Sequence, residues 1–217
     1  MSLTYGRRGP ERAKRLVVFL HGYGANGADL LSLADPLMPH LPETAFLAPD
    51  APDACAGNPM GFHWFPIPWL DGSSQDAAEA AAADAADKLN AFLDERMEAE
   101  GVSAAQTILL GFSQGTMMTL EVAPRRAEPF AGLVCFSGRL MRAERLAAET
   151  VSKPPVLLIH GDKDDVVPFS SMQEAGSALQ ASGFEVYGHV MQGTAHGIAP
   201  DGLQVALAFM RKEFGLG

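Results

Sequence analysis

The chain has 217 residues, two cysteines and a formal net charge of −10 at pH 7. This length suits one α/β domain with a substantial core, so we expect a single domain over residues 1–217. The negative charge argues against a nucleic-acid partner, because binding to phosphates depends on clustered Lys and Arg that release counterions. We find no stretch that would cross a bilayer and expect no stable membrane insertion.

The apolar run LVVFL near the N-terminus follows several basic residues, as in a secretory signal. The run is too short for the apolar part of a signal peptide and stops at His21, so it predicts a buried strand. Two cysteines are too few for a disulfide framework, and Cys135 in GLVCFSG is better explained as a small buried side chain than as a reactive thiol. We therefore expect a cytoplasmic protein.

Short apolar runs rich in strand-forming residues recur along the chain. They lie at 16–21, 44–48, 107–112, 132–137, 156–160 and 184–190. Because these runs are continuously apolar rather than alternating, they predict strands that are covered on both faces. The predicted class is α/β, with a mostly parallel central sheet and helices on both of its faces.

Helical patterns separate these strands. One apolar stripe at helical spacing consists of Ala78, Ala82, Ala85, Leu89, Phe92 and Met97, and charged residues occupy most of the other side, as an amphipathic helix requires. Ser170 and Gln173 have the spacing of a capping box, which predicts a helix from Ser170 towards Gly183. A last stripe, from Leu203 to Phe214, predicts a C-terminal helix. We find no internal repeat.

The segment 49–74 is rich in Pro and Gly and interrupts the alternation of strands and helices. Loops of this length in a compact domain are usually lids or binding loops. It carries several aromatic residues, among them Trp64, Phe65 and Trp69. These rings could fill a satellite core beneath the loop or form a wall of an apolar substrate pocket. We take substrate contact by these three residues as the working hypothesis.

The sequence GFSQG, residues 111–115, places Ser113 after a predicted strand and before the helical run QGTMMTLEVA. A strand that turns sharply into a helix exposes a serine at the bend as a nucleophile, and close packing at the bend explains Gly111 and Gly115. The motif alone is common, but this context favours it over an ordinary loop serine.

A serine nucleophile needs a base to accept its proton and an acid to orient that base. His196, in GTAHGIAP, follows the last predicted strand and is the candidate base. The run HGDKDDVVP supplies three aspartates. Asp162 is closest to the strand end, where Asp commonly caps a turn, and the choice between Asp164 and Asp165 stays open on physical grounds alone.

The other histidines fit the base less well. His21 and His160 each end a predicted strand before Gly, where an imidazole commonly bonds neighbouring loops, and His189 lies inside a strand pattern. His40 and His63 precede Ser113 in the chain. No two histidines have metal-ligand spacing, so we expect no metal.

Acyl transfer also needs hydrogen-bond donors for the developing oxyanion. The backbone N–H of Gln114, directly after the nucleophile, is one candidate. The run HGYGANG, residues 21–27, follows an early strand and is flexible enough to turn an amide inward. The N–H of Tyr23 is the second candidate.

These motifs together resemble the phospholipase/carboxylesterase family of α/β-hydrolases, which includes the acyl-protein thioesterases. The resemblance is carried by FLHGYGANG, GFSQG, HGDKDDVVP and AHGI and spans nearly the whole chain. It implies an α/β-hydrolase fold and ester or thioester hydrolysis without a cofactor. It also implies a triad of Ser113, Asp164 and His196, with the amides of Tyr23 and Gln114 as the oxyanion hole.

The sequence therefore predicts a serine carboxylesterase that cleaves a small-molecule ester of short to medium acyl chain. A thioesterase on acylated proteins or small thioesters is the alternative within enzymes, because the same triad serves both. A non-catalytic α/β-hydrolase that binds a ligand is the rival from another class. A homodimer is compatible with the sequence.

Overall fold

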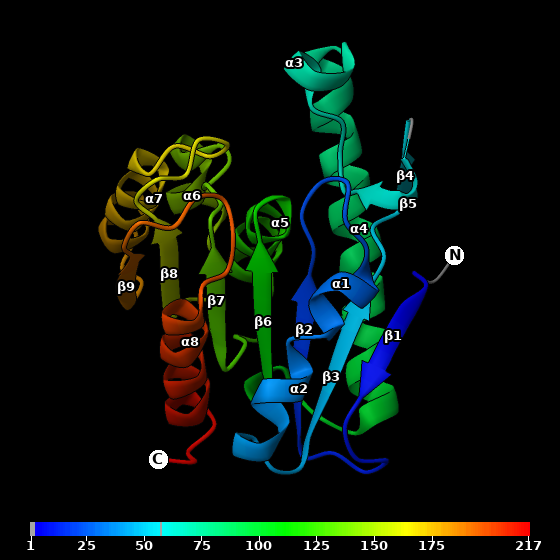
Figure 1. Cartoon of the computed structure of the whole chain (residues 1–217), viewed down its shortest axis with the longest axis vertical. Coiled ribbons are helices and arrows are strands. Elements are labelled where there is room, and N and C mark those ends of the chain that lie inside the picture. The colour runs from blue at the N-terminus through cyan, green and yellow to red at the C-terminus, as the bar shows by residue number, and fades with distance from the viewer. Residues whose placement is uncertain (1–2, 57) are drawn as a thin grey trace.

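The computed structural model describes residues 3–56 and 58–217, and its centre is a seven-stranded sheet in the order β1-β3-β2-β6-β7-β8-β9 (Figure 1). The strands of this sheet are β1 (Tyr5–Arg8), β2 (Arg15–Leu20), β3 (Thr44–Pro49), β6 (Thr107–Phe112), β7 (Gly132–Phe136), β8 (Val156–Gly161) and β9 (Val186–Met191). Neighbouring strands run parallel except for β1, which pairs antiparallel with β3. The predicted α/β class with a mostly parallel sheet is confirmed.

All six predicted strands are present, within a residue or two of the expected bounds. The additional strand β1 lies at the edge of the sheet, with Tyr5 paired to Pro49. Its side chains are exposed or half-buried. An edge strand of this kind has no continuous apolar run, so the sequence pattern did not predict it.

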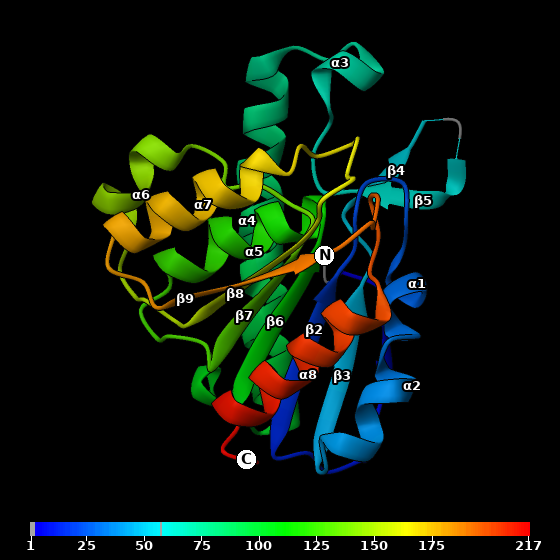
Figure 2. The same ribbon diagram turned by 60° about the vertical axis from the view of Figure 1, so that its left-hand side comes forward.

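Helices cover both faces of the sheet (Figures 1 and 2). They are α1 (Gly27–Leu31), α2 (Ala34–Leu37), α4 (Gln75–Glu100), α5 (Gln114–Val122), α6 (Ala143–Glu149), α7 (Ser170–Ala181) and α8 (Pro200–Glu213), with short 3₁₀ turns at Met38–His40, Ala104–Gln106 and Ala123–Arg125. Helices α1, α2 and α8 share one core with the sheet, and α4 to α7 share the other. A membrane span would need a longer apolar helix than any that the described residues form.

Strand β2 shows why these runs are continuously apolar. Leu16, Val18 and Leu20 point into the core under α4 and α5, whereas Val17 and Phe19 point into the core under α1 and α8. Successive side chains of a strand face opposite sides of the sheet. Both sides of β2 are therefore buried by helices.

The predicted helices form, but one predicted cap does not. Helix α4 begins after Ser74, whose hydroxyl accepts a hydrogen bond from the Ala77 N–H at 3.1 Å. Helix α7 begins at Ser170 as expected, yet its N-cap is Phe169 and no side chain caps it. The capping-box prediction for Ser170 and Gln173 is therefore wrong, although the start of the helix was placed correctly.

The predicted loop 49–74 contains structure of its own, and its residue 57 lies outside the described part of the chain. It forms a hairpin of β4 (Asp53–Cys55) and β5 (Asn58–His63) and a short helix, α3 (Pro68–Asp71). Helix α3 and the first turns of α4 project beyond the carboxyl-end edge of the sheet (Figure 1). We call residues 65–79 the arm.

Candidate active site

Ser113 lies at the sharp bend between β6 and α5, with φ 55° and ψ −114°. Positive φ is rare and costly for a residue with a side chain, so surrounding contacts must hold it. The Ser113 N–H donates to the carbonyl of Phe136 at 2.9 Å. A Cβ on Gly115 would collide with the carbonyl oxygen of Leu20. The strand, bend and helix expected around Ser113 are all present.

Asp164 is the aspartate of HGDKDDVVP that faces His196. Its Oδ2 lies 2.8 Å from His196 Nδ1, and its Oδ1 accepts hydrogen bonds from the N–H groups of Val166 and Val167 at 3.0 and 2.9 Å. Burial alone would raise the pKa of Asp164, but the bonds from His196 and from these two N–H groups outweigh it and lower the pKa. The charged carboxylate favours a proton on His196 Nδ1.

His160 approaches the same carboxylate from β8. Its Nε2 lies 2.9 Å from the carbonyl oxygen of Val167 and 3.3 Å from Asp164 Oδ2. Because a carbonyl can only accept, this nitrogen carries the hydrogen. His160 is buried, and the expectation that it bonds a neighbouring loop is confirmed. Its approach to Asp164 is a feature that the sequence did not reveal.

The other two aspartates of this loop have different places. Asp162 Oδ1 accepts a hydrogen bond from the Gly193 N–H at 2.7 Å, so it ties the loop after β8 to the loop that carries His196. The turn cap expected for Asp162 is thus replaced by a bond between loops. Asp165 is exposed and has no hydrogen bond or ion pair among the described residues. Of the three aspartates in this loop, only Asp164 contacts His196.

His196 follows β9, and its ring packs against Phe112 with the ring centroids 4.9 Å apart. Because Nδ1 faces Asp164, Nε2 is the ring nitrogen left for a proton transfer. Ser113 and His196 both line one cleft of about 530 Å³, the active-site cleft. The structure therefore brings a candidate nucleophile, base and acid together at the carboxyl ends of the strands.

Two backbone N–H groups at this cleft could stabilise an oxyanion. Gln114 is the first residue of α5, so its N–H has no partner within the helix. Tyr23 lines the cleft from the loop after β2. In the described part of the chain neither N–H has an acceptor. The Tyr23 loop is packed closely on the bend, since a Cβ on Gly22 would lie 3.1 Å from Ser113 Cβ.

His21 holds the Tyr23 loop in place through two hydrogen bonds of its ring. Its Nδ1 donates to the Gly22 carbonyl at 2.8 Å, and its Nε2 accepts from the Ala51 N–H at 2.9 Å. Only a neutral imidazole can make both bonds. Burial lowers the pKa of His21, which favours this neutral form. The structural role expected for His21 is confirmed.

The Gln114 side chain has a role that the sequence analysis missed. Its Oε1 accepts from the Trp64 N–H at 2.8 Å, and its Nε2 donates to the Phe65 carbonyl at 2.7 Å. The residue after the nucleophile thus fastens the root of the arm to the bend. No local pattern could have revealed this role, because both partners of the side chain lie about fifty positions away in the chain.

The aromatic residues of segment 49–74 divide between core and cleft. Phe65 and Trp69 line the cleft, and Trp69 is 77% exposed at its mouth. Trp64 has no exposed surface and donates its Nε1 hydrogen to the His21 carbonyl at 3.0 Å. The structure corrects the expectation for Trp64, which fills the core beneath the arm. Substrate contact by Phe65 and Trp69 stays a prediction.

Burial accounts for the two cysteines, and a surface contact accounts for His189. Cys55 and Cys135 are free and buried, and burial raises the pKa of both thiols. The interpretation of Cys135 as a small buried side chain is confirmed. His189 bonds Asp201 at 2.8 Å on the surface. Within the described ranges, no cluster of His, Cys, Asp and Glu is arranged to hold a metal ion.

Known proteins match nearly the full length of the chain. The family model described as phospholipase/carboxylesterase matches residues 7–214. The crystal structure of esterase PE8 is similar with a TM-score of 0.92 and 44% sequence identity, over 98% of this chain and 99% of that one.

Two sequence relatives are more distant. Esterase YpfH of Escherichia coli is 27% identical over 208 residues, which cover 92% of this chain and 83% of that protein. Acyl-protein thioesterase 1 homolog 1 of Dictyostelium discoideum is 27% identical over 202 residues, which cover 90% of this chain and 89% of that protein. Esterases and a thioesterase are thus both among the similar proteins.

Proposed function

We propose a serine carboxylesterase activity for this chain, which belongs to the phospholipase/carboxylesterase family and has the α/β-hydrolase fold. The proposed substrates are small-molecule esters of short to medium acyl chain. The observation that carries the proposal is the 2.8 Å contact of Asp164 with His196, beside a cleft that Ser113 also lines from a strained bend. The esterases among its relatives support hydrolase chemistry.

In the proposed reaction, Ser113 Oγ attacks the ester carbonyl carbon while its proton passes to His196 Nε2. Asp164 keeps the Nδ1–H in place and stabilises the imidazolium. The N–H groups of Tyr23 and Gln114 stabilise the oxyanion, each contributing about 3 kcal/mol. The C–O bond then breaks, and the departing alcohol takes the proton from Nε2. The acyl group remains on Ser113.

Water completes the cycle by the same route. His196 Nε2 accepts a proton from water as the water oxygen attacks the acyl carbon. Collapse of the second tetrahedral intermediate breaks the bond to Ser113 Oγ, which recovers its proton from Nε2. The products are a carboxylic acid and an alcohol, and no cofactor enters any step.

Thioester hydrolysis is the second candidate. The relative named acyl-protein thioesterase supports it. A thioester carbonyl is attacked in the same way, and a thiol leaves in place of the alcohol. The active-site cleft of about 530 Å³ has room for a small thioester as well as an ester.

The composition of the chain supports a proposal for its cellular location and its partners. Two free, buried cysteines fit the reducing cytoplasm. A net charge of −10 does not favour nucleic acid or anionic membranes as partners. We propose a cytoplasmic enzyme whose partner is a small-molecule ester, without membrane insertion, and a homodimer is compatible with this role.

The test is a screen of acyl esters and acyl thioesters of graded chain length with the purified full chain. We expect the highest kcat/KM on esters of short to medium chain. The Ser113→Ala variant should lose activity by roughly a millionfold in kcat, because a methyl group fits the bend but cannot attack.

Circular dichroism and thermal unfolding of Ser113→Ala should match the parent. Residual ester hydrolysis within about tenfold of the parent would contradict the nucleophile. A parent that cleaves thioesters far faster than matched esters would favour the second candidate.

A further inference from the structure

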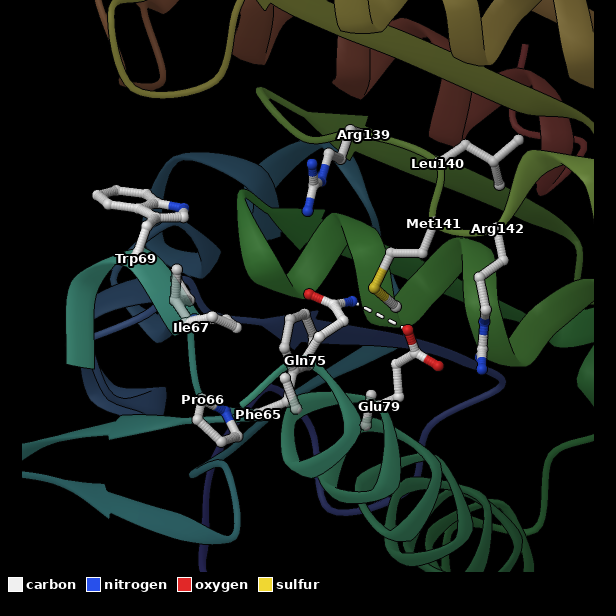
Figure 3. A pocket seen from close by; sticks show the side chains of 13 residues that line it. Phe65, Pro66, Ile67, Trp69, Gln75, Glu79, Arg139, Leu140, Met141 and Arg142 are labelled. Carbon is white, nitrogen blue, oxygen red and sulfur yellow. Dashed lines mark hydrogen bonds between the residues drawn. The ribbon is translucent and has the colours of Figure 1, made fainter. Parts of the chain in front are cut away.

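A second cavity adjoins the active-site cleft, and we call it the side cavity. Its volume is about 370 Å³, and it lies between the arm and the loop Arg139–Arg142 (Figure 3). The residues that line both cavities are Phe65, Ile67, Trp69 and Arg139. The two cavities therefore lie side by side at these four residues, and the side cavity is the space next to the cleft towards which a long substrate held at Ser113 would extend.

Charged groups stand on two sides of the side cavity. On the arm side, Glu79 accepts a hydrogen bond from the Gln75 amide at 2.9 Å. On the loop side, Arg142 forms an ion pair with the buried Glu121. These charges already have partners within the protein, so they are less free to bind a ligand.

Arg139 differs from these residues. Its side chain extends from the loop into the cavity (Figure 3). Among the residues that the structure describes, none offers its guanidinium a carboxylate or another hydrogen-bond acceptor. Arginine presents a planar fork of donors that suits a carboxylate. The unpaired guanidinium therefore has its binding capacity free at the boundary of the two cavities.

The backbone that carries Arg139 is fixed relative to the nucleophile. A Cβ on Gly138 would lie 2.8 Å from the carbonyl oxygen of Ser113, and the Ser137 N–H donates to the Ile159 carbonyl at 2.8 Å. Arg139 therefore directly follows Gly138, whose backbone packs closely on the bend at Ser113. A group that it binds would lie at a constrained distance from the reacting carbonyl.

The direction of the substrate follows from the proton transfers. The leaving oxygen must face His196, because it takes its proton from that ring. His196 lines the active-site cleft but not the side cavity. The side cavity therefore suits the acyl chain, which leaves the carbonyl in another direction.

We infer that Arg139 binds a carboxylate at the far end of the acyl chain, so that the enzyme prefers half-esters of dicarboxylic acids. The inference rests on the proposed esterase function. The distal carboxylate takes no part in the bond changes: Ser113 attacks only the ester carbonyl, and the products are the dicarboxylic acid and the alcohol. Arg139 is a specificity residue.

The test compares 4-nitrophenyl half-esters of adipic, pimelic and suberic acid with the 4-nitrophenyl esters of unsubstituted acids of equal chain length. The Arg139→Gln variant should lose about tenfold in kcat/KM on the best half-ester, the loss expected for one charge-assisted hydrogen bond, mainly through KM. Its kcat/KM on the neutral esters should stay within about twofold of the parent, and Arg139→Lys should recover part of the preference.

Two further variants serve as controls. Glu79→Gln removes the negative charge on the facing wall, so it should raise the preference for half-esters by about twofold, as expected for a partly screened charge. Arg12→Gln removes an exposed arginine that precedes β2 and lines neither cavity, and it should leave the preference unchanged. It matches Arg139→Gln in net charge.

An unchanged ratio of half-ester to neutral-ester kcat/KM in Arg139→Gln would overturn the inference, whether the values on both series stay the same or fall by the same factor. In both cases the parent would still hydrolyse neutral esters, so the proposed function would stand. A parent that hydrolyses neither series would contradict the proposed function and this inference with it.

Discussion

The bend at Ser113 and the arm over the cleft are built in different ways. Backbone contacts from β7 and β2 hold the Ser113 backbone at a strained φ of 55°. On the arm, Trp69 and Leu70 are 77% and 53% exposed, and the Gln114 amide fastens only the root. The core thus positions the proposed catalytic atoms. The surface of the arm that would contact the acyl chain has few contacts with that core.

Apart from removal of the nucleophile itself, the largest expected effect tests the catalytic side of this comparison. Asp164→Asn should lower kcat at neutral pH by about ten-thousandfold, because the amide strands His196 in the wrong tautomer. Asp165→Asn is the matched control, since Asp165 is its exposed neighbour, and it should change kcat by less than about threefold. Steady-state kinetics on a neutral ester measures both. An exchange of these behaviours would contradict the assignment of Asp164.

The second prediction compares two tryptophans of segment 49–74, of which one is buried in the core and the other is exposed on the arm. Trp64→Ala should lower the free energy of unfolding by about 3–5 kcal/mol, because the ring is fully buried. Trp69→Ala should change it by less than about 0.5 kcal/mol. It should instead alter the kcat/KM ratio between short and longer acyl esters by about tenfold, since a methylene in an apolar pocket is worth roughly 1–3 kcal/mol.

Urea unfolding and a chain-length series give both readings for these variants. A Trp69→Ala enzyme with an unchanged chain-length profile would show that the exposed part of the arm does not contact the acyl chain. A Trp64→Ala protein as stable as the parent would contradict the core role of that ring.

The sequence could predict what depends on short-range pattern. Continuous apolar runs located the inner strands because these are buried on both faces, and GFSQG located the bend because its glycines pack closely against neighbouring backbone. The run at 184–190 located β9 as well, although β9 is an edge strand whose residues are mostly half-buried. The same reasoning could not separate Trp64 from Trp69. Both follow proline- and glycine-rich sequence. Trp64 is held in the core by partners far away in the chain, since its N–H bonds Gln114, fifty positions on, and its ring nitrogen bonds the His21 carbonyl.

Other features depended on pairing between distant segments. Strand β1 exists because it pairs with β3, although its own residues are largely polar. The choice between Asp164 and Asp165 depended on where the loop after β9 places His196. Physical reasoning on the loop alone left that choice open, and the family resemblance selected the aspartate that the structure brings to His196.

The smallest expected effect concerns His21, which holds the loop between β2 and α1 beside the bend at Ser113. Burial lowers the pKa of His21 in the folded state, so below about pH 6.5 the unfolded chain binds the proton more readily. The free energy of unfolding should therefore fall as the pH drops from about 6.5 towards the folded-state pKa. His21→Gln should lack this component.

Urea unfolding at several pH values between about 5 and 7.5 measures the difference between parent and His21→Gln. We expect the two pH profiles to diverge progressively below about pH 6.5, with the parent losing stability faster than His21→Gln as the pH falls. Parallel profiles would contradict the neutral imidazole that links the Gly22 carbonyl and the Ala51 N–H.

Covalent labelling of Ser113 by a fluorophosphonate probe tests the central claim most directly, because the probe reacts with a serine only when a base and an oxyanion site activate it. Intact-mass spectrometry should show one probe per chain, and peptide mapping should place it on Ser113. Ser113→Ala should take up none. An unmodified parent would favour a non-catalytic ligand-binding protein, and labelling that persists in Ser113→Ala would show that another residue is the nucleophile.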